Sequence, residues 1–354
     1  MSATRRCFSS QSFARAKVVV VGSGRMGQIR SSLLYANPRF DLVGIVDVNF
    51  EGATALAQKY EAEAFRDLEE AIAAASSMGG DSRKLQGVIV STPTHTHSSI
   101  ITESTNHGIS VFTEKPVDET AEQIRKLFDV ASNKIDLCCG FQRRFDPSYA
   151  AAAETIQSGS IGAPVSANII FADHPVPPKE FLLYGGGNII MDLAPHDVDF
   201  IMCALQDEVI SVYATGSSST SELEAAGIHD NATMMMKFSK GTIATLYMSR
   251  SAAYGYDQRC EIFGETGKVA VENQHDNSTV LANSDGIRQS VLQHSFPQRF
   301  QQAFANELDA FADTLLLDNK PWPITASDCI RVQKVADAAR LSIELDQPVS
   351  VTYE

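Results

Sequence analysis

The pattern that most constrains the fold lies near the start of the chain. Residues 17–21 (KVVVV) are a short apolar run rich in β-branched side chains, and Gly22, Gly24 and Gly27 follow it in the spacing G-x-G-x-x-G. Apolar residues then recur at helical spacing, and residues 40–47 again resemble a strand. The pattern predicts a βαβ unit with a glycine-rich loop between its first strand and its helix.

The same alternation continues to about residue 140. Strands that alternate with helices at this pace predict a parallel sheet covered on both faces, as in a Rossmann domain. We predict helices near 51–60, 67–75, 98–107 and 119–132, and strands near 62–65, 87–91, 109–113 and 135–141.

The glycine loop and an acidic residue together predict a dinucleotide site. Glycines at this spacing allow a tight turn, close approach of the backbone to a pyrophosphate and close packing of helix on strand. Asp47 ends the next strand, 20 residues after Gly27, where its carboxylate can accept hydrogen bonds from ribose hydroxyls. A carboxylate there would repel a 2′-phosphate, which favours NAD over NADP. The alternative is a solvated acid at the end of a strand.

The second half of the chain has a different rhythm. A helix near 147–158 precedes a strand near 164–172, and strand-like runs separated by turn residues fill 209–273. Helical patterns return near 297–316 and 326–345. We predict an α+β domain with a large, mostly antiparallel open sheet. The predicted organisation is a leader at 1–16, a Rossmann domain at 17–140, and a substrate-binding and oligomerisation domain at 141–354.

The first 16 residues differ in composition from the rest. They contain three arginines and five hydroxyl residues, and no acidic residue precedes Asp41. This composition is typical of a transit peptide and predicts a mitochondrial (matrix) location. The alternative is an ordinary N-terminal tail on a cytoplasmic protein.

Composition argues against several classes of partner. The net charge is −14 and basic residues cluster only in isolated pairs such as Arg143 and Arg144, so nucleic acid is not an expected partner. Apolar runs stay below the roughly 18 residues that span a bilayer, so no membrane association is expected. Six scattered cysteines show neither C-x-x-C nor zinc-like spacing, and we expect no metal site.

Three places could carry chemistry. Lys115 follows the fifth predicted strand, and ligands of parallel sheets bind beyond the carboxyl ends of strands. Asp192 and His196 share one face if a helix begins near 192, and histidine can remove a hydroxyl proton near neutral pH. The alternatives are a surface lysine, an N-cap and a buried histidine. Tyr254 and Tyr256 could contribute phenol groups to a polyol pocket, or simply end a strand.

Seven motifs, taken in order, resemble the Gfo/Idh/MocA oxidoreductase family and, within it, the inositol 2-dehydrogenases. The resemblance runs from about Lys17 to the C-terminus. The motifs are VGSGRMG, VDVN, STPTHTH, TEKPV, GFQRRFDPSY, GGGNIIMDLAPHDVDF and YGYDQRCEIFGETG.

The resemblance implies a role for each matched residue. His196 would be the general base, Lys115 would contact the reacting hydroxyl and the nicotinamide ribose, and Asp192 would hold substrate and base in register. Substrate contacts are implied for Arg143 and for Tyr254 or Tyr256. The implied cofactor-binding residues are Gly22, Gly24, Arg25, Met26, Gly27, Asp47, Thr92, Pro93, His97, Glu114 and Lys115.

The resemblance also implies the reaction. A secondary hydroxyl of a cyclic polyol, first of all myo-inositol, would be oxidised to the 2-keto inositol with hydride transfer to NAD, in a homodimer or homotetramer. Phe304 departs from the pattern, because relatives often have tyrosine there, and this leaves the substrate open. The alternatives are a related sugar or dihydrodiol dehydrogenase and a non-catalytic NAD-sensing protein.

Overall fold

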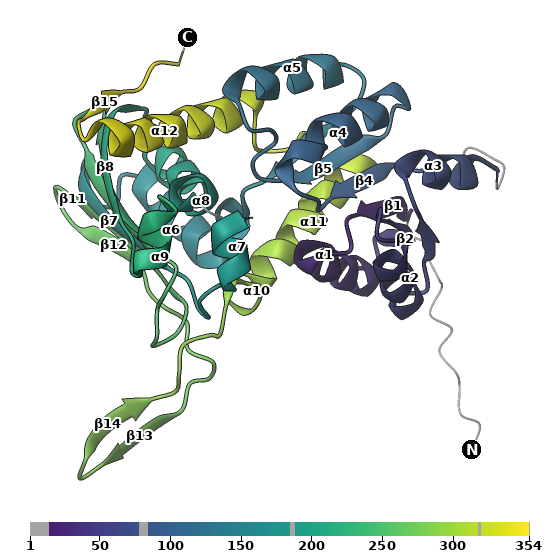
Figure 1. The fold of residues 1–354 in the computed structure, drawn as a ribbon. Helices are drawn as coiled ribbons and strands as arrows, with labels where there is room; N and C mark the ends of the chain where they lie inside the picture. Colours follow the sequence, from purple (N-terminus) through teal and green to yellow (C-terminus); the bar gives the residue numbers. More distant parts are fainter. Residues whose placement is uncertain (1–13, 78–83, 185–187, 318–319, 354) are drawn as a thin grey trace, which may run out of the picture.

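A six-stranded parallel sheet forms the first half of the protein, as predicted. The computed structural model describes residues 14–77, 84–184, 188–317 and 320–353. The strands lie in the order β3-β2-β1-β4-β5-β6 and pair in parallel (Figure 1). They are β1 (Ala16–Val21), β2 (Phe40–Val46), β3 (Glu63–Phe65), β4 (Gly87–Val90), β5 (Ser110–Glu114) and β6 (Leu137–Gly140).

Helices cover both faces of this sheet. In Figure 1, α1 and α2 lie on one side of the strands and α4 and α5 on the other. The predicted helices are therefore present, with boundaries shifted by a few residues. They are α1 (Arg25–Ala36), α2 (Phe50–Lys59), α3 (Leu68–Ser77), α4 (His97–Asn106) and α5 (Ala121–Ala131), with a short 3-10 helix, η2 (Thr94–Thr96), before α4.

The C-terminal part of the chain returns to this sheet. Helix α11 (Gln301–Leu316) packs against α1 and β1, and the ring of Phe311 lies 6.4 Å from that of Phe40 and 5.8 Å from that of Phe112. Burial of such aromatic rings is a main source of packing energy. The predicted boundaries place this segment in the second domain, and it packs both on α1 and β1 of the first sheet's layer and on residues 142–145.

A seven-stranded sheet organises the second half. Its order is β12-β11-β7-β10-β9-β8-β15. Within the described residues its strands pair antiparallel except β7 and β10, which are parallel, so the mostly antiparallel sheet is confirmed. The strands are β7 (Pro164–Ala172), β8 (Val209–Ser217), β9 (Asn231–Phe238), β10 (Ile243–Ser249), β11 (Asp257–Gly264), β12 (Lys268–Val271) and β15 (Val349–Ser350).

One face of this sheet is covered and the other is open. Helices α6 (Pro147–Gln157), α8 (Ile189–Leu205) and α12 (Ala326–Leu345) pack on each other or on the strands. Along β9, Met234 and Met236 are buried, whereas Met235 between them is 46% exposed. Alternate residues of a strand face opposite sides, so Met235 lies on the open face with Ile243 and Tyr247 of β10.

Several elements differ from the predictions or were not predicted. Helix α8 begins at Ile189, three residues early, because Asn188 caps it by accepting hydrogen bonds from the N–H groups of Ile190 and Met191. The helix predicted at 297–316 divides into α10 (Phe296–Arg299) and α11. Additional elements are α7 (Lys179–Tyr184), α9 (Ser221–Ala225), the 3-10 helix η3 (Gln142–Phe145), β13 (Val280–Asn283) and β14 (Gly286–Gln289).

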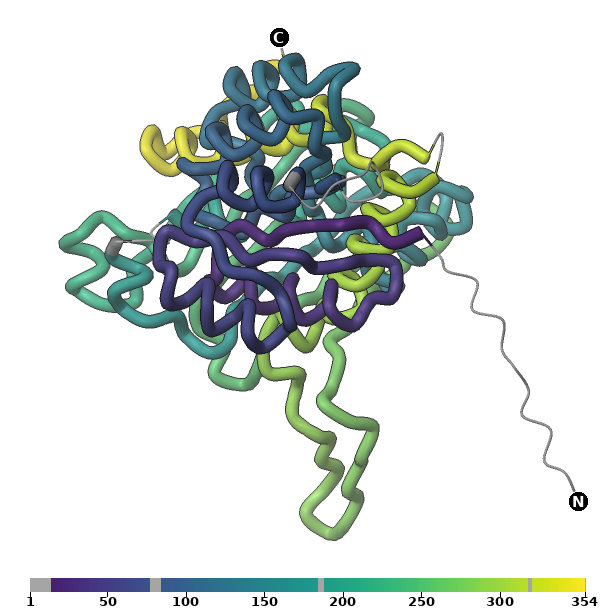
Figure 2. The backbone as a smooth tube through the Cα atoms, turned by 90° about the vertical axis from the view of Figure 1, so that its right-hand side faces the viewer, coloured from purple at the N-terminus to yellow at the C-terminus, as the bar shows by residue number. Residues whose placement is uncertain are grey.

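Strands β13 and β14 form a hairpin that projects from the body of the protein in both views (Figures 1 and 2). All of its strand residues are exposed. Most of the predicted leader, residues 1–13, lies outside the described residues, whereas Ala16 already belongs to β1 and is buried. In the described part of the chain, no helix combines the length and apolar character needed to cross a membrane.

Replacement of Gly27 should destabilise the first domain. A Cβ atom at Gly27 would lie 1.8 Å from the carbonyl oxygen of Gly22, which is backbone and cannot turn away. We expect Gly27→Ala to lower the free energy of unfolding by about 3 kcal/mol, measured by urea denaturation. At Gly24 a Cβ would meet no atom within 4 Å. Gly24→Ala should therefore cost under about 1 kcal/mol, and equal losses would contradict this account of the loop.

Candidate active site

The glycine loop has the form that a pyrophosphate requires. Gly22 has a φ of +106°, and a Cβ there would lie 2.6 Å from the carbonyl oxygen of Ser91, so only glycine fits this turn. The space over Gly24 is open. Gly24 is also the N-cap of α1, and as a glycine it has no side chain with which to cap the helix. The N–H groups of the first turn, which includes Arg25 and Met26, thus remain available to an anion.

Asp47 stands beside this loop with its charge stabilised. One carboxylate oxygen accepts hydrogen bonds from the N–H and hydroxyl of Ser23, both at 2.7 Å, and the other accepts from the N–H of Asn49 at 2.8 Å. Partial burial raises the pKa of the Asp47 carboxyl, but these hydrogen bonds outweigh it and leave the pKa below its ordinary value. Asp47 is therefore ionised at neutral pH, which suits a ribose diol and opposes a 2′-phosphate.

His97 connects two loops at the carboxyl edge of the sheet. Its ring nitrogens lie 3.0 Å from the carbonyl oxygens of Thr92 and Pro116, and its side chain is buried. Pro93 is the N-cap of η2. His97 thus holds the loop after β4, where Thr92 and Pro93 lie, against the turn that carries Lys115.

Glu114, the last residue of β5, belongs to a buried charge cluster. It accepts a hydrogen bond of 2.7 Å from Arg30, which also binds Glu307 at 2.8 Å. Burial raises the pKa of Glu307 to about 7, Glu114 adds to this effect, and Arg30 opposes it. The guanidinium of Arg30 lies 4.9 Å from the ring of Phe304, so this phenylalanine packs on a cation. Arg30 and Glu307 were not predicted, because nothing in the sequence pairs residues 277 positions apart.

Lys115 and Asp192 meet, although Lys115 follows a strand of the first sheet and Asp192 lies on a helix that packs on the second. The lysine Nζ lies 3.0 Å from Oδ1 of Asp192 and 2.5 Å from its backbone carbonyl oxygen. The lysine side chain is 12% exposed and that of Asp192 is 39% exposed, so the pair is reachable from solvent on the aspartate side. The structure therefore brings these two predicted residues together. The glycines before them, residues 185–187, lie outside the described residues.

His196 follows Asp192 by one helical turn. Pro195 lies inside α8 and not in its first turn, since the helix begins at Ile189. Burial lowers the pKa of His196 well below its ordinary value, and the positive charges of Lys115 and Arg143 add to this effect. Its Nδ1 is buried without a hydrogen-bond partner among the described residues. A neutral imidazole of this kind can accept a proton at neutral pH.

Arg143 and Tyr256 lie beneath the surface. The Arg143 guanidinium is 1% exposed, 2.8 Å from Oδ1 of Asp197 and 2.6 Å from Oε1 of Gln258. Tyr256 is 3% exposed and its ring contacts Phe171 edge to face. Both residues serve the core of the second domain in this structure, and substrate contact by either stays a prediction.

Tyr254 is in a different position. Its side chain is 63% exposed, and its hydroxyl donates a 2.7 Å hydrogen bond to Asp257. Asp257 also binds Arg259 at 2.7 Å. Of the two tyrosines, Tyr254 is therefore the one that a ligand can reach from solvent, although its hydroxyl already binds Asp257.

Sequence reasoning missed Arg250, which also binds Asp192. Its Nη1 lies 2.7 Å from Oδ2 of Asp192 and 3.3 Å from Oδ2 of Asp173. Burial raises the pKa of Asp192, but Lys115 and Arg250 lower it further, and the net pKa lies far below the ordinary value. Asp192 is thus a permanent acceptor at physiological pH.

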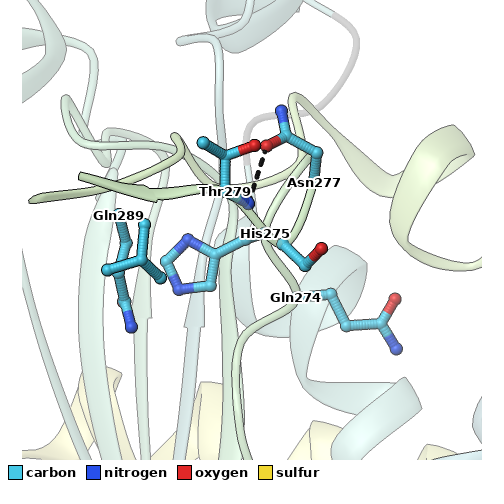
Figure 3. A pocket seen from close by; sticks show the side chains of 7 residues that line it. Gln274, His275, Asn277, Thr279 and Gln289 are labelled. Carbon is cyan, nitrogen blue, oxygen red and sulfur yellow. Dashed lines mark hydrogen bonds between the residues drawn. The ribbon is translucent and has the colours of Figure 1, made fainter.

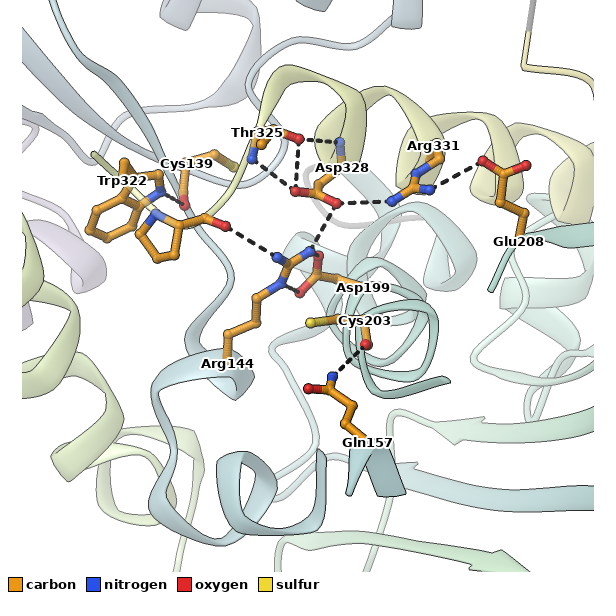
Figure 4. A network of polar contacts seen from close by, with 11 residues as sticks. Cys139, Arg144, Gln157, Asp199, Cys203, Glu208, Trp322, Thr325, Asp328 and Arg331 are labelled. Atoms are coloured by element: carbon orange, nitrogen blue, oxygen red, sulfur yellow. Dashed lines mark hydrogen bonds and ion pairs between the residues drawn. The ribbon is translucent and has the colours of Figure 1, made fainter. Parts of the chain in front are cut away.

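Two helical turns beyond Asp192, a second ion-pair network fixes α8 (Figure 4). Arg144 of η3 binds both oxygens of Asp199, at 2.8 and 2.6 Å, and lies 3.3 Å from Asp328 of α12. Asp328 is also paired with Arg331 at 3.1 Å. These groups contain none of the predicted site residues, so their role is to hold α8 and α12 together.

Two cavities lie away from these residues. A cavity of about 420 Å³ lies at the base of the hairpin, lined by Gln274, His275 and neighbouring polar residues (Figure 3). A second, of about 400 Å³, is lined by residues of α6, α10 and α11 among others. None of the predicted site residues lines either cavity. Among the described residues, no group of three or more His, Cys, Asp or Glu side chains could hold a metal ion.

Two family models match this chain. The oxidoreductase family model with an NAD-binding Rossmann fold matches residues 16–139, and the GFO/IDH/MocA C-terminal domain matches residues 149–270. The open loop over Gly24 and the ionised Asp47 fit that cofactor. NAD is therefore the expected dinucleotide on structural and family grounds alike.

Relatives and solved structures cover nearly the whole chain. Inositol 2-dehydrogenase of Rhizobium meliloti is 32% identical over 94% of this chain and 98% of its own length. Myo-inositol 2-dehydrogenase of Thermotoga maritima is 29% identical, over 95% and 98%. The crystal structure of scyllo-inositol dehydrogenase from Lactobacillus casei with bound NAD(H) and scyllo-inositol has a TM-score of 0.87 at 26% identity, covering 95% of this chain and 99% of that chain. The chain belongs to the GFO/IDH/MocA family of oxidoreductases, in which its first domain is the NAD-binding Rossmann fold.

Proposed function

We propose that the protein oxidises one secondary hydroxyl of a cyclic polyol, first of all myo-inositol, to the 2-keto inositol. The observation that carries this proposal is the meeting of Lys115 with Asp192, one helical turn before His196, in a chain whose full-length relatives are named inositol dehydrogenases. NAD, held at the glycine loop and Asp47, would supply the hydride acceptor when bound.

The residues of the chain would handle the proton and the charge. His196, kept neutral by burial and by neighbouring cations, removes the hydroxyl proton. Lys115 lies beside it and stabilises the alkoxide that develops, and Asp192 accepts a hydrogen bond from a neighbouring hydroxyl. Base, cation and hydride acceptor are then all assigned, so the proposal gives no task to a metal. Activity should persist in a strong chelator.

Two alternative functions can be distinguished from this one by an enzyme assay. The same residues could oxidise a related sugar or dihydrodiol, because ring stereochemistry is read by the geometry of hydroxyl contacts. A non-catalytic NAD-sensing protein could also use this fold. The presence of Lys115, Asp192 and His196 together favours catalysis, since a protein that only binds NAD has no need of all three.

We also propose a homodimer or homotetramer that uses the open face of the large sheet. Met235, Ile243 and Tyr247 are each more than two-fifths exposed on this face of the single chain, which favours burial against another surface. A monomeric mass in light scattering would contradict the proposal.

From the leader composition we propose import into the mitochondrial matrix, which imaging of a tagged full chain would check.

The first test is a substrate panel. Protein, NAD and one candidate substrate are mixed, and NADH is followed by its absorbance with myo-inositol, scyllo-inositol, glucose and xylose. We expect NADH to form with an inositol. Turnover of a sugar alone would redirect the proposal to a sugar dehydrogenase, and saturable NAD binding without turnover would favour the sensor.

His196→Ala should lower kcat by about a hundredfold to ten-thousandfold, the usual contribution of a positioned base. The control is His107→Ala, an exposed histidine at the end of α4. Both variants are assayed at saturating NAD. A decrease in kcat of only a few-fold in His196→Ala would contradict the assignment of His196 as the general base.

The pH dependence gives an independent check on the same residue. The base must be neutral, and its pKa is lowered, so activity persists below pH 6.5 and declines only as pH falls through the lowered value. An acid limb of kcat/KM at or above 6.5 would contradict a buried, neutral His196.

Asp47→Ala should relax the preference for NAD. The variant loses acceptors for the ribose hydroxyls and the charge that repels a 2′-phosphate. We therefore expect kcat/KM with NAD to fall, and the ratio of kcat/KM with NADP to kcat/KM with NAD to rise. Asp41→Ala is the matched control, at the opposite end of the same strand. An unchanged ratio of NAD to NADP in Asp47→Ala would refute the assignment.

A further inference from the structure

The parallel pairing of β7 and β10 places two charged residues side by side. Ser249 at the end of β10 is in register with Ala172 at the end of β7, so Arg250 and Asp173 leave the sheet at the same edge. The N–H of Asp173 donates to the carbonyl oxygen of Ser249 at 2.8 Å, which extends the pairing by one step. An antiparallel pair would have sent these residues to opposite ends of the sheet.

Arg250 extends from this edge to Asp192. The result is a row of four alternating charges, which runs from Lys115 through Asp192 and Arg250 to Asp173. Its members come from the turn after β5, from α8, and from the ends of β10 and β7. This row of charges therefore connects the two domains.

The burial of these groups divides their tasks. The Arg250 side chain is 3% exposed, so it does not reach a substrate that enters from solvent. Asp192 is 39% exposed and can. Each carboxylate oxygen has two lone pairs, so Asp192 can bind Lys115 and Arg250 and still accept a hydrogen bond from a substrate hydroxyl.

We propose that Arg250 is a positioning residue: anchored by Asp173, it keeps Asp192 charged and oriented toward a hydroxyl of the polyol. The inference rests on the proposed function for its substrate, and on the contacts of Arg250 for its geometry. It assigns Arg250 to polyol binding and not to NAD binding.

Removal of Arg250 acts on Asp192 in a defined direction. Among the described residues, the charged groups that face Asp192 are Lys115 and Arg250. Asp173 faces it through Arg250 and is itself influenced by Arg25, and His196 lies on the same helix. Without Arg250 the pKa of Asp192 rises, because Lys115 alone then opposes the effect of burial. A carboxylate with a raised pKa protonates as pH falls and then no longer acts as a pure acceptor.

The kinetic experiment compares Arg250→Gln, Arg250→Lys and Asp173→Asn with the wild-type chain. We expect Arg250→Gln to raise the polyol KM about tenfold to a hundredfold, with the increase growing as pH falls, and to leave the NAD KM unchanged. Arg250→Lys should raise the polyol KM less than Arg250→Gln does, because the positive charge is kept. Asp173→Asn should also raise the polyol KM by a smaller factor than Arg250→Gln. An unaltered polyol KM in Arg250→Gln would overturn the proposal.

The matched control is Arg144→Gln, which breaks a buried arginine–aspartate pair two helical turns further along α8. It should lower the melting temperature while leaving the polyol KM and the pH profile unchanged. If Arg144→Gln produced the same kinetic change as Arg250→Gln, a general loosening of α8 would explain both and the proposal would fail.

Two further measurements isolate Asp192. In an Asp192→Asn background, Arg250→Gln should add little to the polyol KM, because a residue that acts through Asp192 has no further effect once it is gone. Carbon-13 NMR of aspartate carboxyls, assigned with Asp192→Asn, should show Asp192 titrating at higher pH in Arg250→Gln than in wild type. This titration needs no turnover, so it decides the role of Arg250 even if no polyol is oxidised, and an unshifted Asp192 would refute that role.

Discussion

The contact on which the site depends is the ion pair between Lys115 and Asp192. Lys115 follows the fifth strand of the Rossmann sheet, and Asp192 lies on the helix that covers the second sheet. Neither domain alone holds both groups, so the relative placement of the domains decides whether the site exists. The C-terminal part of the chain contributes to that placement, because α11 packs on β1 and its Glu307 pairs with Arg30 of α1.

Local patterns were sufficient to predict the first domain. The valine run, the glycine spacing and Asp47 are read from neighbouring residues, and short parallel crossovers leave few topologies to choose from. The motif resemblance likewise placed Lys115, Asp192 and His196, and the structure brings Lys115 to Asp192. These features depend on residues that are close in sequence or on segments whose order along the chain determines their order in space.

What could not be predicted depends on register and on the boundaries of single elements. Arg250 meets Asp173 because β7 and β10 pair in parallel, and turn signals alone do not reveal one parallel pair inside a mostly antiparallel sheet. The start of α8 was placed late because Asn188 lies in a stretch of glycines, where its capping role was not apparent. Arg143 and Tyr256 match family motifs, yet a motif does not specify burial, and both side chains are covered.

The electrostatics of the site combine burial with positive charges, of which Lys115 acts on two neighbouring groups. Lys115 lowers the pKa of Asp192 and of His196 together. For the carboxyl this means that the charged form persists, and for the imidazole it means that the neutral form does. The same positive charge therefore produces a fixed acceptor and a free base one helical turn apart, over the same range of pH. Arg250 strengthens the first effect through its contact with Asp192, whereas burial is the larger cause of the second and Arg143 adds to it. Burial and these cations together keep two titratable groups in the protonation states that alcohol oxidation requires.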